Sequence, residues 1–205
     1  MMEKKDVRIP QQKRSIEKKD KIMEAATQIF MKQGYFHTNT ADIAKAAGIS
    51  TGTVYAYFED KKAILLACLY QFGDTLTKEI CEKVANLSFT GDIRSTIKNV
   101  LRLFVNYHNW TKLLHDEIMS LRYIDSDVKE YFIHIQKTMM TAVTDQLNAA
   151  GFVFTHEREQ TFLLFQMIMG IEDELAFDHR EDIDQEVLIE ECARTIVPML
   201  IKKDS

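Results

Sequence analysis

The chain has 205 residues, 46% hydrophobic and 28% charged, which is the composition of an ordinary soluble globular protein. Its longest apolar run, Phe162 to Ile171, is interrupted by Gln166 and falls short of the ~20 residues that a membrane-spanning helix needs. The charged N-terminus lacks the pattern of a secretory segment, so we expect a cytoplasmic protein. Two prolines, seven glycines and no sustained two-residue alternation predict an all-α fold.

Charge is distributed unevenly along the chain. The net charge of −5 would by itself argue against binding to nucleic acid. Residues 1–62, however, hold 12 Lys and Arg against 8 Asp and Glu, whereas residues 63–205 hold 14 against 23. A basic head on an acidic body is the arrangement that phosphate electrostatics favours. We therefore predict a DNA-binding domain over residues 1–62 and a second, acidic domain over residues 63–205.

The first fifteen residues are polar and carry several basic side chains. Lys13 and Arg14 are candidates for a basic arm that contacts phosphates or a minor groove, with a solvated tail as the alternative. From Ile16 to Gln33, apolar residues recur on one face and predict a helix that Gly34 ends. This helix is expected to pack over the segment that follows it and to complete a three-helix head.

The segment that begins at Thr38 predicts two short helices joined by a tight turn. Thr38 is the expected N-cap of the first helix, Asn39–Ala47, and Gly48 is expected to end it, because the αL conformation costs glycine little. Ser50 is the expected N-cap of the second helix, Thr51–Tyr57. This short connection containing glycine is typical of a helix-turn-helix, in which the second helix enters the DNA major groove.

The second helix carries residue types that suit a DNA contact. Gly52 and small side chains allow a close approach, while Thr and Tyr hydroxyls and the N-terminal amides suit phosphate oxygens. Val54 and Phe58, four residues apart, are expected to anchor the helix in the core. Lys61 opposes the dipole of the next helix, a conflict that a neighbouring phosphate would remove; a solvated lysine is the alternative. The candidate DNA-binding residues are Lys13, Arg14, Thr38, Asn39, Thr40, Ser50, Thr51, Gly52, Thr53, Tyr55, Tyr57 and Lys61.

The residues from Gly34 to Lys61 read G-Y-x-x-T-x-x-x-D-I-A-x-x-A-G-I-S-x-G-T-V-Y-x-Y-F-x-D-K. This long pattern resembles the DNA-binding signature of the TetR (tetracycline-repressor-like) family of transcriptional regulators. Asn39 and Thr40 depart from it, since the family usually has Thr and an apolar residue there. The resemblance implies a homodimer that binds double-stranded operator DNA and whose C-terminal helical body binds a small-molecule effector.

Helical patterning continues through the rest of the chain, so that about nine helices are expected. A long helix from Lys61 to about Val84 is expected to carry the head at one end and to touch the body along the rest. The further predicted helices cover residues 93–108, 110–121, 126–150, 155–177 and 184–201. Pro198 is expected to kink the last helix near its end.

The predicted body is rich in aromatic residues and methionine, which line either a ligand cavity or a plain core. A few polar groups lie on or beside these apolar faces, as they do in small-ligand sites. Because the set is mostly aromatic and Met, we expect a largely apolar effector. The candidate pocket residues are Phe104, Tyr107, His108, Trp110, Tyr123, Met139, Phe162, Phe165, Gln166 and Met169.

Dimerisation is expected because one short recognition helix contacts too few base pairs to bind a specific site tightly. The last two predicted helices, Thr155–Phe177 and Asp184–Ile201, would pair with their copies in a four-helix interface. The candidate interface residues are Ile171, Leu175, Leu188, Cys192 and Ile196.

No motif for catalysis or metal binding is apparent. The sequence has no nucleophile elbow, P-loop or paired-carboxylate pattern, and its histidines do not stand in a known ligand spacing, so we expect no catalytic residues, no metal and no cofactor. Three scattered cysteines fit reduced thiols better than disulfides. The sequence predicts a repressor that a ligand releases from a palindromic operator. An activator or ligand-independent regulator remains open, as does a helical-pocket carrier or enzyme.

Overall fold

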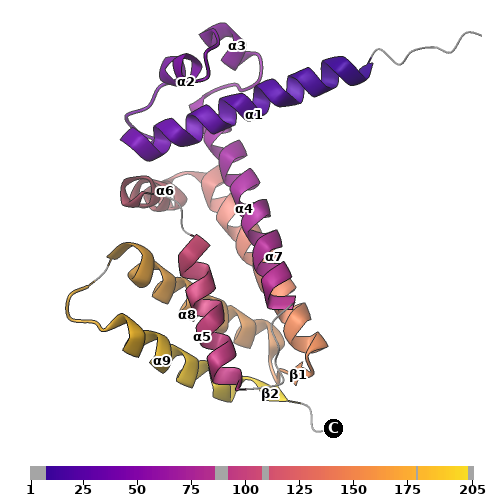
Figure 1. Cartoon of the computed structure of the whole chain (residues 1–205), viewed down its shortest axis with the longest axis vertical. Helices are drawn as coiled ribbons and strands as arrows, with labels where there is room; N and C mark the ends of the chain where they lie inside the picture. The colour runs from indigo at the N-terminus through magenta and orange to yellow at the C-terminus, as the bar shows by residue number, and fades with distance from the viewer. Residues whose placement is uncertain (1–7, 86–91, 108–110, 179, 203–205) are drawn as a thin grey trace, which may run out of the picture. The chain divides into compact units, whose positions relative to one another are not determined.

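The computed structural model describes residues 8–85, 92–107, 111–178 and 180–202; for residues 8–13, 83–85, 103–107 and 201–202 it describes the backbone alone. Over these ranges the chain is built from α-helices, so the predicted all-α fold with about nine helices is confirmed (Figure 1). The helices are α1 (Arg8–Gln33), α2 (Thr40–Ala46), α3 (Thr51–Tyr55), α4 (Lys61–Ala85), α5 (Ile93–Tyr107), α6 (Lys112–Ile124), α7 (Ser126–Ala149), α8 (Glu157–Asp173) and α9 (Gln185–Ile196). Two short strands, β1 (Phe152–Val153) and β2 (Ile201–Lys202), pair antiparallel.

The helices form two compact units. The first unit holds Met1–Phe72 and Trp110–Tyr131, and the second holds Gly73–Asn109 and Phe132–Ser205. Helices α4 and α7 therefore contribute residues to both units. This division differs from the predicted boundary after Lys62, because α6 packs against the N-terminal helices through contacts that no local sequence pattern reveals.

The first unit is organised around a core shared by α1, α2, α3 and the start of α4. Ile22 and Phe30 of α1 are fully buried together with Ile43 of α2 and Val54 of α3, and Phe58 joins them after α3 ends. Burial of each such side chain stabilises the fold by about 1.5–3 kcal/mol relative to exposure. The predicted anchoring role of Val54 and Phe58 is confirmed.

Helix α1 begins at Arg8, well before the predicted start at Ile16. The turns of α1 before Ile16 carry no apolar face, and Ile16 itself is exposed. The spacing of apolar residues therefore does not predict helix before Ile16. Pro10 lies in the first turn, where its missing N–H removes no intrahelical hydrogen bond. The helix ends as predicted before Gly34, whose φ of +82° lies in the left-handed region.

The core of the second unit lies between α5, α8 and α9. Leu101, Leu164, Ile189 and Ala193 are among its buried residues. A smaller cluster forms around Ile80 of α4 and Met139 of α7.

Both C-terminal helices end in irregular turns. Helix α8 runs into a π-helical turn, Glu174–Asp178, and the buried Glu174 accepts hydrogen bonds from the amide and the guanidinium of Arg180 at 2.8 and 2.7 Å. Helix α9 ends at Ile196 and a 3₁₀ turn, Val197–Met199, follows. The predicted helix to Ile201 thus ends early, because Pro198 lacks the N–H that would continue the ladder of hydrogen bonds.

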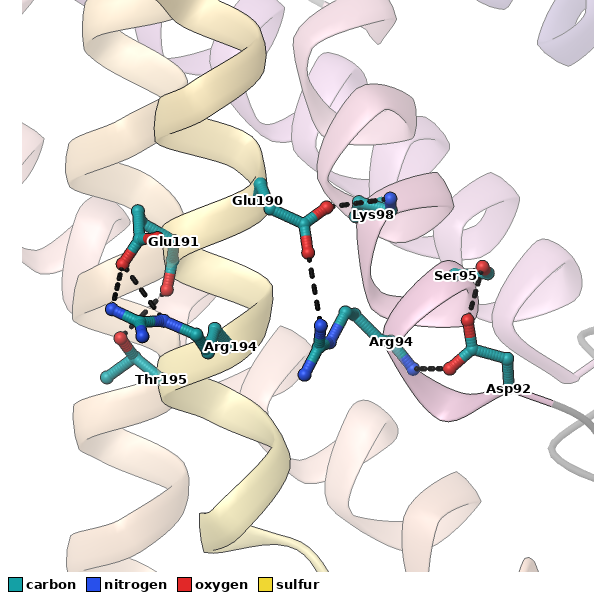
Figure 2. A network of polar contacts seen from close by, with 8 residues as sticks. All are labelled: Asp92, Arg94, Ser95, Lys98, Glu190, Glu191, Arg194 and Thr195. Atoms are coloured by element: carbon teal, nitrogen blue, oxygen red, sulfur yellow. Dashed lines mark hydrogen bonds and ion pairs between the residues drawn. The ribbon is translucent and has the colours of Figure 1, made fainter.

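Charged side chains of α5 and α9 face one another in the second unit (Figure 2). Arg94 and Lys98 lie 3.4 and 2.8 Å from the carboxylate of Glu190. Further along α5, Arg102 lies 2.7 Å from Glu186. The three basic residues are spaced four apart on α5, and the two glutamates are spaced four apart on α9. The ion pairs therefore form an antiparallel ladder. Because each pair is partly exposed, it contributes at most about 1 kcal/mol.

Candidate DNA-binding site

Helix α2 starts one residue later than predicted, and its N-cap is Asn39 rather than Thr38. The Asn39 side chain accepts from the amide of Asp42 at 2.9 Å, and the Asp42 carboxylate accepts from the amide of Asn39 at 3.2 Å. This reciprocal capping box satisfies amides that the first turn of a helix leaves without a partner. Asn39 is one of the two departures from the family pattern, and here it performs the capping that we had assigned to Thr38.

Thr38 is instead a buried structural residue. Only 3% of its surface is exposed, and its hydroxyl donates to the carbonyl of Gly34 at 2.6 Å. The side chain offers almost no surface to DNA, which argues against the predicted contact by Thr38. Thr40, in the first turn of α2, is partly exposed.

The turn and the start of α3 follow the prediction. Gly48 has a φ of +62°, the left-handed conformation expected after α2. Ser50 caps α3, because its hydroxyl oxygen accepts from the amide of Thr53 at 3.1 Å and lies 2.8 Å from the Thr53 hydroxyl. These two hydroxyls are therefore partners of one another on the exposed side of the turn.

Helix α3 is short and has one buried side. Val54 is fully buried, whereas Tyr55 is 55% exposed. Gly52 is exposed, and Thr51, Thr53 and Tyr57 are partly exposed. The contact candidates of this helix therefore lie on the side away from the core, while Val54 on the opposite side anchors the helix in the core.

Lys61 does not extend freely from the first turn of α4. Its ammonium donates to the carbonyls of Tyr35 and Thr38, both at 2.7 Å, and lies 4.2 Å from the centre of the Tyr35 ring. Burial lowers the pKa of Lys61, and the nearby carboxylate of Glu117 partly offsets that effect. The lysine that we expected at a phosphate therefore fastens the loop before α2 onto α4.

Glu117 of α6 is a residue that the sequence did not reveal. It lies 82 positions from Tyr35, yet its carboxylate accepts a short hydrogen bond from the Tyr35 amide and one of 3.3 Å from the Phe36 amide. Thr111, which caps α6, also donates to the carbonyl of Met31 at 3.0 Å. Helix α6 is thus joined to the end of α1 by polar contacts that only the folded chain brings together.

Lys62, the next residue of α4, is held by ion pairs at the start of α7. Lys62 lies 3.2 Å from Asp125 and 2.5 Å from Asp127, and hydrogen bonds to Asp127 and Asp125 raise the pKa of Lys62. Asp125 also accepts from the amides of Asp127 and Val128 and so caps α7. Burial favours the neutral form of Asp125, but these amides and Lys62 outweigh it and lower the pKa of Asp125.

The predicted basic arm lies partly outside the described residues. Arg14 is exposed on α1. Lys13 belongs to the same helix, but its side chain is not among those described. DNA contacts by either residue remain predictions.

The structure disperses the predicted pocket residues. Met139, Phe165 and Met169 pack around Ile80 in the smaller cluster of the second unit. Tyr123 is wrong as a pocket residue, because it is 83% exposed and belongs to the first unit, at the end of α6. Four further candidates are not covered: the side chains of Phe104 and Tyr107, and the whole of His108 and Trp110, lie outside what the structure describes.

A surface groove of about 980 Å³ does lie along α7 and α8. Phe162 lines this groove. Gln166, one turn further along α8, accepts a hydrogen bond of 3.2 Å from Gln136, which also lines the groove. Its apolar lining comes from Ile133, Met140, Phe162 and Leu163. The groove shares only Phe162 with the predicted set, because the period of an apolar stripe does not distinguish a packed core from a cavity wall.

The structure places the predicted dimer residues in or beside the core of the second unit. Leu175, Cys192 and Ile196 are buried within the core of one chain, and Ile171 and Leu188 pack against that core. The apolar stripe of a helix covers its nearest partner, which here is another helix of the same unit. The large apolar side chains left exposed on α8 and α9 are Phe162, Leu163 and Val187.

The cysteines are poorly suited to sensing oxidants. Burial raises the pKa of Cys68 and of Cys192 to about 11 and also raises the pKa of Cys81. Since the thiolate is the reactive form, these shifts lower the thiolate fraction of all three residues near neutral pH. Within the described ranges, no group of His, Cys, Asp or Glu is arranged to hold a metal ion, and none of the helices there is long and apolar enough to cross a membrane.

Comparison with known proteins identifies the N-terminal segment. Residues 22–68 match the family model described as bacterial regulatory proteins, tetR family. The HTH-type transcriptional regulator HbdR of Aromatoleum sp. (strain CIB) is 40% identical over 72 residues, 35% of this chain and 31% of that protein. The fatty acid metabolism regulator protein of Bacillus subtilis (strain 168) is 31% identical over 91 residues, 42% of this chain and 41% of that protein. The chain thus spans less than half the length of either relative.

The similarity of fold extends further than the similarity of sequence. A TetR transcription regulator from Haloarcula marismortui ATCC 43049 superposes with a TM-score of 0.71 at 17% identity, covering 90% of this chain and 99% of that one. The signature from Gly34 to Lys61 lies inside the matched segment and folds into the capped helix pair α2 and α3. Residues 22–68 thus match the family of bacterial regulatory proteins described as tetR, and they contain the helix-turn-helix of this chain.

Proposed function

We propose that this protein is a DNA-binding transcriptional regulator, a repressor that binds a palindromic operator as a homodimer. The observation that carries the proposal is the presentation of α3: Val54 and Phe58 fix it in the core, and Tyr55 is held outward. The first unit would dock this helix in the major groove, with Thr51, Gly52 and Thr53 facing the bases and phosphates. The functions of the named relatives support a regulatory rather than an enzymatic role.

The homodimer would place two copies of α3 on one face of the duplex. Half-sites should then be inverted and about one helical turn, or a multiple of it, apart. Leu163 and Val187 are exposed apolar side chains of α8 and α9 that a partner would cover. They would extend the predicted set, of which Ile171 and Leu188 are partly buried.

We further propose that a largely apolar effector releases the operator from the protein. The groove of α7 and α8 offers Ile133, Met140 and Phe162 to an aliphatic chain, and Lys137 and Arg158 to an acidic end group. A relative that regulates fatty acid metabolism directs the choice of probe toward straight-chain fatty acids. By linkage, such a ligand must bind the DNA-free protein more tightly by the same factor that it weakens DNA binding.

Selection from a pool of random duplexes tests the central proposal. The full chain should enrich inverted repeats, and the affinity for the enriched duplex should fall linearly with the logarithm of the salt concentration. A carrier or an enzyme with a structural N-terminal region would enrich nothing and show no salt-dependent affinity for a duplex. Titrating the selected complex with fatty acids of increasing length then tests the effector, and unchanged affinity with every length would contradict it.

A further inference from the structure

The loop from Gly34 to Thr38, which leads from α1 into α2, is held from two directions. Its carbonyls at Tyr35 and Thr38 accept from the ammonium of Lys61, as described above. Its amides at Tyr35 and Phe36 point the other way and donate to the carboxylate of Glu117. The position at which α2 begins is thus fixed by one cation and one anion from helices that follow it in the chain.

The amide side of this loop forms an anion-binding nest. Gly34 adopts a left-handed φ of +82°, and the two amides that follow converge on one oxygen of Glu117. Successive amides in such a conformation make a concavity that favours negative charge. The fit is close, because a Cβ atom built on Gly34 would lie 2.5 Å from one carboxylate oxygen of Glu117 and 2.7 Å from the other.

The carboxylate in this nest is removed from solvent, since Glu117 is only 8% exposed. A buried carboxylate is costly unless donors compensate it, so its removal leaves two amides without their acceptor. His37 stands 4.0 Å away but is mostly exposed, so this contact contributes little. Lys61 acts on the same loop from the side of its carbonyls.

We propose that Glu117 is a positioning residue for DNA recognition, whose carboxylate docks in the nest of the Tyr35 and Phe36 amides and thereby fixes the start of α2. The inference rests on the proposed function, because α2 positions α3 against the operator. It adds a residue of α6 that touches no DNA and lies far in sequence from the helix-turn-helix.

The test compares Glu117→Ala and Glu117→Gln with Asp116→Asn in the full chain. Asp116 is the adjacent exposed carboxylate of the same helix and pairs with Lys112 at the surface, so its replacement gives the same change in net charge. Affinity is measured by fluorescence anisotropy on the selected operator and on a random duplex, and exchange of the residue 34–38 amides is followed by hydrogen–deuterium exchange.

Glu117→Ala should weaken operator binding about tenfold or more and accelerate amide exchange at Tyr35 and Phe36, while Asp116→Asn matches the parent. Binding to random DNA should stay the same or tighten slightly, because a negative charge is lost. Sodium formate, compared with sodium chloride at equal ionic strength, should restore both affinity and amide protection by placing an anion in the nest. Glu117→Gln keeps the size of the side chain and should show a smaller loss; it serves for the comparison if Glu117→Ala does not fold.

Operator affinity equal to that of the parent in both Glu117 variants would overturn the inference while leaving the proposed function intact. The same holds if Asp116→Asn loses as much affinity as Glu117→Ala, or if formate has no effect beyond that of chloride. A parent protein that binds no duplex would overturn the proposed function itself, and this inference with it.

Discussion

The ammonium of Lys61 lies above the ring of Tyr35 and donates to the carbonyl of the same residue. The contact joins the first turn of α4 to the loop before α2, across 26 positions of sequence. A lysine at the start of a helix normally opposes the helix dipole, but here the carbonyls and the aromatic ring compensate its charge. Lys61, at the start of α4, therefore has structural partners inside the first unit.

Lys61→Ala should destabilise the protein by about 1–3 kcal/mol, since it leaves two carbonyls without a charged donor. Thermal melts followed by circular dichroism measure this loss, with the exposed Lys78→Ala in α4 as the control. The salt dependence of operator binding should stay unchanged. A slope that falls by about one ion with unchanged stability would instead make Lys61 a phosphate contact.

Tyr55→Ala should weaken operator binding while changing the free energy of unfolding by no more than about 0.5 kcal/mol, as is usual for an exposed site. Tyr55→Phe separates the hydroxyl from the ring: equal losses for both variants assign the contact to the hydroxyl. Anisotropy titrations on the selected operator and on random DNA provide the measurement. Undiminished affinity in Tyr55→Ala would remove this side chain from the interface.

The local features of the head were predictable from sequence, whereas its long-range contacts were not. Gly48 and Ser50 act through neighbours within a few residues, so residue type alone indicates their roles. Glu117 and Lys61 act through the folded chain: the local sequence draws attention to Lys61 but not to its partners, and it does not mark Glu117 at all. The apolar stripe through Cys192 was visible, but a stripe does not tell whether its partner is the same chain or a second copy.

Acid should weaken the ion pairs that Lys62 of α4 makes with Asp125 and Asp127 at the start of α7. The pKa of Asp125 in the folded chain lies below its ordinary value of 3.8, so its contribution is fully present above that value and is lost as the pH falls through the lowered pKa. Asp125→Asn should therefore flatten the decline in melting temperature below about pH 4 relative to the parent. Asp116→Asn provides the control, and parallel pH curves for parent and Asp125→Asn would contradict the assignment.

The exposed and buried leucines of the second unit should respond differently to substitution. Leu163→Glu places a charge on the proposed dimer surface and should shift the protein toward monomer with little loss of stability. Leu175→Ala opens a cavity in the core and should cost about 2–5 kcal/mol while leaving the dimer intact. Sedimentation velocity at micromolar concentration separates the two effects. A Leu163→Glu protein as dimeric as the parent would exclude this surface.

The ion pairs between α5 and α9 favour one register of α9 along α5, which the apolar contacts of the core do not determine (Figure 2). Leu188, Cys192 and Ile196 repeat every four residues, so α9 could slide by one turn along its groove and still bury an apolar side chain at each step. Charges do not repeat in this way, because Arg194 follows Glu190 at the same interval. A slip that set Arg194 against Lys98 would oppose two cations. The ladder thus favours one register of α9 and helps to determine which of its side chains stay exposed.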